Sequence, residues 1–75
     1  MLIAILSGYY SEAEPLLKAA EKQGKKAFYV NSEYDLKMND FTDAVYVGSY
    51  EKRADFKALN SFIKNKLCDS HIFTY

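Results

Sequence analysis

The sequence contains few of the residues that build disulfide frameworks and metal sites. It has one Cys, one His, one Pro, three Gly and no Trp among its 75 residues. A single Cys cannot form an internal disulfide, and Cys68 with His71 cannot supply the four ligands of a structural zinc site. We therefore expect no disulfide scaffold and no metal, and we expect Cys68 to pack as a small apolar side chain.

An excess of one charge and a long apolar run are also missing. Ten Lys and Arg residues balance ten Asp and Glu residues, which argues against a nucleic-acid partner. The apolar run at 2–6 is far shorter than the roughly 18 residues that a membrane span needs. No basic segment precedes this run, so we expect neither a secretory signal nor a membrane partner, and the expected location is the cytoplasm.

What the chain has is a large apolar and aromatic content. The apolar fraction is 49%, with seven Tyr and five Phe, which is too hydrophobic for a disordered chain. The length corresponds to a single domain, residues 1–75. A chain of this size buries only about 62% of its unfolded surface, so its net stability is small. Such a chain has little stability to spare, and a partner subunit or a ligand could add to it.

Strand and helix patterns alternate along the first third of the chain. Residues 2–6 are apolar without interruption, which indicates a strand buried on both faces of a sheet. Residues 12–23 carry a helical stripe (Ala13, Leu16, Leu17, Ala20). Ser11 and Glu14 match a capping box before this helix, and Gly24 can end it in the left-handed conformation.

The remaining elements are read in the same way. We expect strands at 27–30, 44–47 and 71–75, and a helix from 51 to about 67 with a stripe at Phe56, Leu59, Ile63 and Leu67. The segment 31–43 is ambiguous. Its alternation resembles a short edge strand, its second half could form one helical turn, and it is too short for a full crossover helix.

This element order predicts an α/β domain with a mostly parallel sheet. The strands at 2–6 and 44–47 are apolar throughout, so we place them centrally, which gives the strand order 2-1-3-4. The domain would have two or three layers and a reduced flavodoxin-like or Rossmann-like arrangement.

Two loops with similar residues follow the two central strands. Ser7-Gly8-Tyr9 and Gly48-Ser49-Tyr50 each lead from a buried strand toward a helix. Adjacent parallel strands would bring these loops together at the carboxyl edge of the sheet, where open α/β domains bind ligands. Ser7, Gly8, Ser11, Gly48 and Ser49 could then hold a nucleotide or another phosphorylated ligand. Both nucleotide-binding glycine fingerprints are absent, and Gly and Ser are also the ordinary residues of such turns.

The tyrosines suggest a different role for the same edge. Tyr9, Tyr10 and Tyr50 would lie on it, with Tyr34 and Arg53 nearby, and Tyr is enriched at protein interfaces. Our leading hypothesis is a non-enzymatic domain that contacts a protein partner or a second copy of itself through these five residues. The small-ligand site is the alternative. We assign no cofactor.

Catalysis is the weakest of the three hypotheses. Cys68 and His71 could form a nucleophile–base pair, but a helix end and a strand start would not align them. Residues 7–14, Ser-Gly-Tyr-Tyr-Ser-Glu-Ala-Glu, loosely resemble the start of nucleoside 2-deoxyribosyltransferase-like domains. Those enzymes are about twice as long, and no segment here matches their catalytic carboxylate, so the resemblance implies at most a remnant nucleoside-processing fold. By analogy, short chains of this kind are common among accessory proteins of phages and mobile elements.

Overall fold

Four strands form one sheet in which every neighbouring pair is parallel. The computed structural model describes residues 1–75, and the strands are β1 (Leu2–Ser7), β2 (Lys26–Tyr29), β3 (Asp43–Val47) and β4 (Ile72–Thr74). Their order is β2-β1-β3-β4, and β1 pairs with both β2 and β3. β4 pairs with β3 in parallel as well. The predicted fold class and strand order are therefore confirmed.

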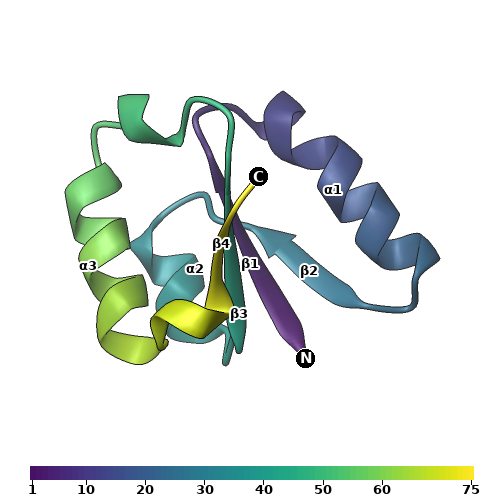
Figure 1. Ribbon diagram of the computed structural model, residues 1–75. Coiled ribbons are helices and arrows are strands. Elements are labelled where there is room, and N and C mark those ends of the chain that lie inside the picture. The colour runs from purple at the N-terminus through teal and green to yellow at the C-terminus, as the bar shows by residue number, and fades with distance from the viewer.

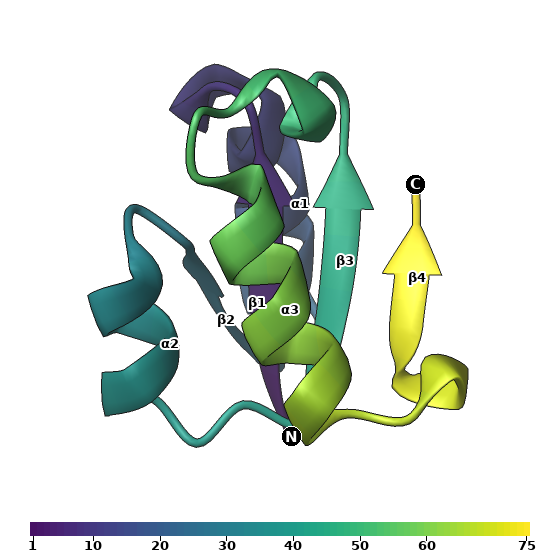
Figure 2. The same cartoon turned by 90° about the vertical axis from the view of Figure 1, so that its left-hand side faces the viewer.

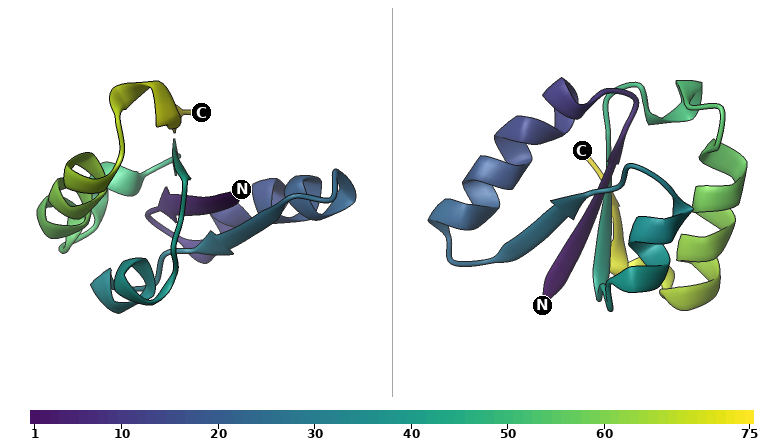
Figure 3. Two further views of the ribbon diagram at one scale, coloured as in Figure 1. Left: turned by 90° about the horizontal axis from the view of Figure 1, so that it is seen from below. Right: turned by 180° about the vertical axis from the view of Figure 1, so that it is seen from behind.

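The helices make three layers with the sheet. α1 (Tyr10–Lys22) lies on one face, and α2 (Glu33–Met38) and α3 (Phe56–Lys66) lie on the other (Figures 1 and 3). Right-handed crossovers explain this division. The chain moves outward from β1 to β2 and then back across the sheet to β3, so the second crossover falls on the opposite face from the first.

Helix α1 begins earlier than the sequence predicted. Its N-cap is Tyr9 rather than Ser11, and the residue that reaches back is Glu12 rather than Glu14. The Glu12 carboxylate accepts a hydrogen bond from the Tyr9 N–H at 3.1 Å. Gly24 follows the helix with φ +72°, as predicted for a left-handed C-terminus.

The ambiguous segment contains a helix, so the expectation that 31–43 is too short for a helical crossover is wrong. α2 has only six residues, and its start is fixed by the Asp35 carboxylate. That carboxylate accepts hydrogen bonds from the N–H groups of Asn31 at 2.8 Å and Ser32 at 3.1 Å. Leu36 and Phe41 are buried, which anchors the short crossover to the core.

Helix α3 begins later than expected, at Phe56 rather than near 51. The chain first makes a 3₁₀ turn, η1 (Tyr50–Lys52), and then becomes extended at Arg53, with φ −68° and ψ 138°. This extended residue interrupts any continuous helix. A second 3₁₀ turn, η2 (Asp69–His71), precedes β4.

The core is unequally divided between the two faces of the sheet. On the α2 and α3 side, nine buried residues form one cluster: Ala4, Leu6, Val30, Leu36, Phe41, Ala44, Tyr46, Leu59 and Ile63. On the α1 side, only Ile5, Ala13 and Val47 are buried together. One helix therefore covers its face much less completely than the two helices opposite.

A contact between the side chains of His71 and Asp43 holds β4 at the amino edge of the sheet. His71 Nδ1 lies 3.0 Å from Asp43 Oδ1, and the Thr42 hydroxyl donates to the other carboxylate oxygen at 2.9 Å. The hydrogen bond with His71 lowers the pKa of Asp43 below its ordinary value, and Thr42 acts in the same direction. Asp43 is only 9% exposed. The carboxylate form thus stabilises the fold.

Replacing Asp43 by Asn should change how stability depends on pH. Because the pKa of Asp43 is lower in the folded than in the unfolded chain, its contribution is present above the unfolded pKa and lost as pH falls through the folded pKa. Between about pH 5 and about pH 3, urea unfolding should show a steeper loss of stability in the wild type than in Asp43→Asn. Asp69→Asn, which removes an exposed carboxylate without an ion pair, should follow the wild type. Parallel profiles for the wild type and Asp43→Asn would contradict this assignment.

Candidate functional site

The two Gly/Ser loops meet at the carboxyl edge of the sheet, as predicted (Figure 2). The Glu12 carboxylate accepts hydrogen bonds from the Ser49 N–H at 3.1 Å and from the Ser49 hydroxyl at 2.8 Å. The backbones are in close contact here, because a Cβ placed on Gly8 would lie 2.6 Å from the Ser49 carbonyl oxygen. Residues 7–11 and 48–50 therefore share one surface, which we call the rim.

The Glu12 carboxylate occupies the donors that an anion would use. The hydrogen bond from the Ser49 hydroxyl lowers the pKa of Glu12 below its ordinary value, and the backbone N–H groups of Tyr9, Ser49 and Gly8 add to the effect. Free N–H groups at such a loop and helix start are what would attract a phosphate. Here a carboxylate of the same chain already holds them.

The other residues of the predicted ligand site either serve contacts within the chain or lie outside the rim's hydrogen-bond network. Ser7 is fully buried, and its hydroxyl donates to the Tyr9 carbonyl at 2.6 Å. Gly48 has φ +61°, and its Cα faces the Glu12 carboxylate, so the glycine serves the close approach of the loops. Ser11 lies exposed in the first turn of α1.

Arg53 is a buried clamp, whereas the sequence suggested an exposed contact residue. Its side chain is 9% exposed, and each of its three guanidinium nitrogens donates. The acceptors are the carbonyls of Ser7, Val30 and Asn31 and both carboxylate oxygens of Asp55. These bonds use all five N–H groups, so none is left for a partner. The Arg53 guanidinium thus lies against the carboxyl ends of β1 and β2.

The predicted contact tyrosines separate into exposed and packed residues. Tyr9 is 66% exposed and Tyr10 is 53% exposed, both at the start of α1. Tyr34 is 65% exposed, on α2. Tyr50 was expected on the exposed rim, but it is half-buried, with its ring 5.1 Å from that of Tyr46 and 5.7 Å from that of Phe56. The aromatic core below the rim draws Tyr50 inward.

Two side chains that could perform acid–base chemistry, Tyr46 and His71, make hydrogen bonds within the fold. The Tyr46 hydroxyl donates to Asn60 Oδ1 at 2.6 Å, and burial raises the pKa of Tyr46 to about 12. His71 pairs with Asp43, and Cys68 is exposed rather than packed as expected. No three His, Cys, Asp or Glu side chains gather as a metal site.

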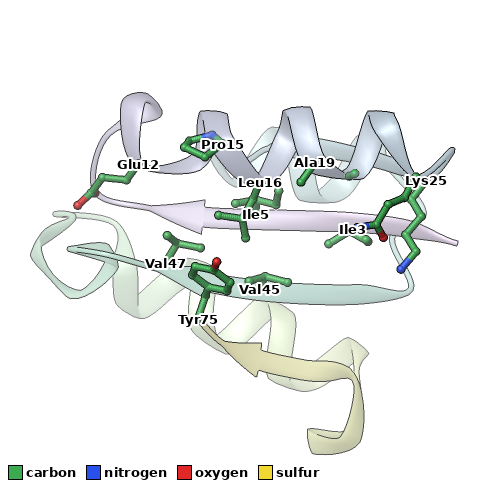
Figure 4. Close-up of a pocket in the computed structure, with 12 residues that line it drawn as sticks. Ile3, Ile5, Glu12, Pro15, Leu16, Ala19, Lys25, Val45, Val47 and Tyr75 are labelled. Atoms are coloured by element: carbon green, nitrogen blue, oxygen red, sulfur yellow. The ribbon is translucent and has the colours of Figure 1, made fainter.

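An apolar groove that the sequence did not predict runs beside α1. The groove has a volume of about 480 Å³ and lies between α1 and the β1 and β3 strands (Figure 4). Its lining is mostly apolar and comprises Ile3, Ile5, Glu12, Pro15, Leu16, Ala19, Ala20, Gln23, Lys25, Val45, Val47 and Tyr75. The continuous apolar strands suggested complete cover on both faces. The only available signal was that the α1 face has one helix for four strands.

Comparisons with protein-family models, curated proteins and solved structures find no match to this chain. The resemblance of residues 7–14 to nucleoside 2-deoxyribosyltransferase-like domains therefore gains no support. The longest helix has 13 residues, and none has the length and apolar character needed to traverse a bilayer.

Removing the Arg53 guanidinium should destabilise the domain strongly. Arg53→Ala leaves three carbonyls and Asp55 without their donor, and such a loss costs about 3 kcal/mol in the free energy of unfolding. Arg53→Lys should recover only part of this, because an ammonium cannot reproduce the planar fork. Chemical unfolding would measure both variants. The neighbouring Lys52→Ala, at an exposed position, should stay within about 0.5 kcal/mol of the wild type, and equal effects at 52 and 53 would contradict the clamp.

Adding a methyl group at Gly8 should separate the two loops of the rim. Gly8 has no positive φ, so Gly8→Ala acts only through its collision with Ser49, which we expect to cost about 3 kcal/mol. Gly24→Ala is the matched control, since it has φ +72° and open space, and should cost only about 1 kcal/mol of backbone strain. Thermal unfolding of both variants checks the difference. Equal costs would show that the loops do not touch in solution.

Proposed function

We propose that this domain binds a protein partner through the exposed aromatic part of the rim, Tyr9 and Tyr10, and that it is not an enzyme. The observation that carries the proposal is the internal use of the rim's polar groups. Glu12 and Arg53 hydrogen-bond within the chain, and Tyr9 remains 66% exposed beside them.

Aromatic side chains at such a position are suited to protein contact. Tyr10 rests edge-on against Tyr29, with ring centroids 5.3 Å apart, so its orientation is already restricted before a partner arrives. A side chain that is ordered in the free protein loses less entropy on binding. Tyr also offers an apolar ring and a hydroxyl donor in one contact. Tyr34, exposed on α2, can extend this surface toward the other face of the sheet.

A small phosphorylated ligand at the Gly/Ser loops has less support as an alternative. It would have to displace the Glu12 carboxylate from the N–H groups of Tyr9 and Ser49. It would also approach a negative charge that no cation of the chain pairs with. Protein contact requires neither change.

Replacing both rim tyrosines should abolish partner binding without unfolding the domain. The double variant Tyr9→Ser, Tyr10→Ser removes two exposed rings that contribute little to the core, so its melting temperature should stay close to that of the wild type. A partner captured from the native host by the wild type should bind the purified double variant at least about tenfold more weakly, as expected when interface aromatics are truncated. Isothermal titration with the purified partner measures the change.

Met38→Ser is the matched control for this experiment. Met38 is 63% exposed, much like Tyr9, but it ends α2 at the opposite end of the crossover from the rim. It should keep the wild-type affinity. A double variant that retains full affinity for every captured partner would overturn the proposal.

A further inference from the structure

Half of the sheet face that carries α1 has no helix over it. α1 packs on β1 and β2, and no helix lies over β3 and β4 on that side (Figure 3). Val45 and Val47 line the groove there, and Phe73, which pairs with Val45 across the strands, is 52% exposed. We call this surface the open strip.

The dimensions of the open strip match a single helix. β3 has five residues, which at about 3.3 Å per residue gives a length of about 16 Å. Two strands at a spacing of about 4.8 Å give a width of about 10 Å. An α-helix is about 10 Å wide, and about 11 residues, the length of α3, extend about 16 Å.

The same dimensions argue against a second copy of the chain as the occupant. The open strip consists of the five residues of β3 and the three residues of β4, whereas each partner of a stable dimer contributes about 20 to 30 residues. A helix instead inserts its apolar face between α1 and the strands, so it contacts both walls of the groove.

Charges at the two ends of the groove give the helix a direction. Glu12 lies at the end next to Val47, and Lys25 lies at the end next to Ile3 (Figure 4). Neither side chain takes part in an ion pair within the chain. The N-terminus of a helix carries partial positive charge and its C-terminus partial negative charge. A helix with its N-terminus beside Glu12 and its C-terminus beside Lys25 places each partial charge next to a side chain of opposite charge.

We infer that the open strip binds one amphipathic helix of about three turns from a partner protein, which lies beside α1 and runs in the same direction. Its apolar residues, at i, i+3 or i+4, and i+7, would pack against the partly or fully exposed side chains of Val45, Ala19 and Phe73. The Lys25 ammonium would donate to the free carbonyls of its last turn. This surface is separate from Tyr9 and Tyr10, so the inference does not rest on the rim.

A displayed library of three-turn helical peptides with varied apolar stripes would test the inference. We expect selection on the full chain to yield amphipathic helices, and amide chemical shifts to change most at Val45, Val47 and Ala19. Ala19 is exposed on α1 and lines the groove, so Ala19→Arg fills the groove from outside without disturbing the core. It should weaken the best peptide at least about tenfold.

Matched variants separate the open strip from the rest of the surface. Ala58→Arg makes the same change at an exposed position of α3, on the opposite face, and should leave peptide affinity within about twofold. The double variant Tyr9→Ser, Tyr10→Ser should also stay within about twofold, which keeps this result independent of the rim. Circular dichroism confirms that each variant is folded.

The direction of the helix has its own readout. A spin label at the peptide C-terminus should broaden the amide signals near Lys25, and a label at the N-terminus should broaden those near Ser49. Lys25→Glu should weaken binding about threefold, whereas Lys22→Glu, outside the groove, should not. The inference would be overturned if the two spin labels broadened the opposite ends of the groove, or if the selected peptides bound outside the groove. A library that yields no binder would also overturn it, as would sedimentation that shows a stable dimer with Ala19 buried in its interface.

Discussion

The Arg53 guanidinium is the interaction on which the carboxyl edge of the sheet depends. β1 and β2 end in carbonyl groups that no further strand residue can satisfy, and the Arg53 side chain reaches three of them from the loop before α3. Asp55 accepts from the same guanidinium and so balances the buried charge. One side chain thereby connects the β1–α1, β2–α2 and β3–α3 loops. The backbone at Arg53 is extended, and α3 begins only after it, at Phe56.

The hydrogen bonds of Arg53 and Glu12 change what the edge can do. An open α/β sheet usually presents free N–H groups where its strand order reverses. In this chain Glu12 accepts hydrogen bonds from these N–H groups and Arg53 donates to the carbonyls, so the polar groups stabilise the fold. The surfaces that remain available are aromatic or apolar: Tyr9 and Tyr10 on the rim, and the groove beside α1. This is why we propose contact with another protein rather than chemistry at the loops.

The fold was predictable because its signals are local and repeated. Apolar runs and a helical stripe gave the strands, α1 and the strand order. The errors arose where one side chain acts over a long distance in sequence. The sequence predicts Arg53 to be a surface cation, because it does not show that the carbonyls which accept from it lie 46 and 23 residues away. The sequence predicts an exposed Tyr50, because it does not show that the rings of Tyr46 and Phe56 pack against it. α2 could have been found, since Ser32 and Asp35 have the spacing of a capping box.

The open strip follows from topology rather than from any single residue. Three right-handed crossovers connect four parallel strands, and the one reversal in strand order puts the first helix on one face and the other two on the opposite face. If a helix covers about two strands, complete cover of both faces requires one more helix than the crossovers supply. Nine buried residues on one side against three on the other are the result. In this domain the strand order therefore leaves about a quarter of the sheet surface without a helix of its own.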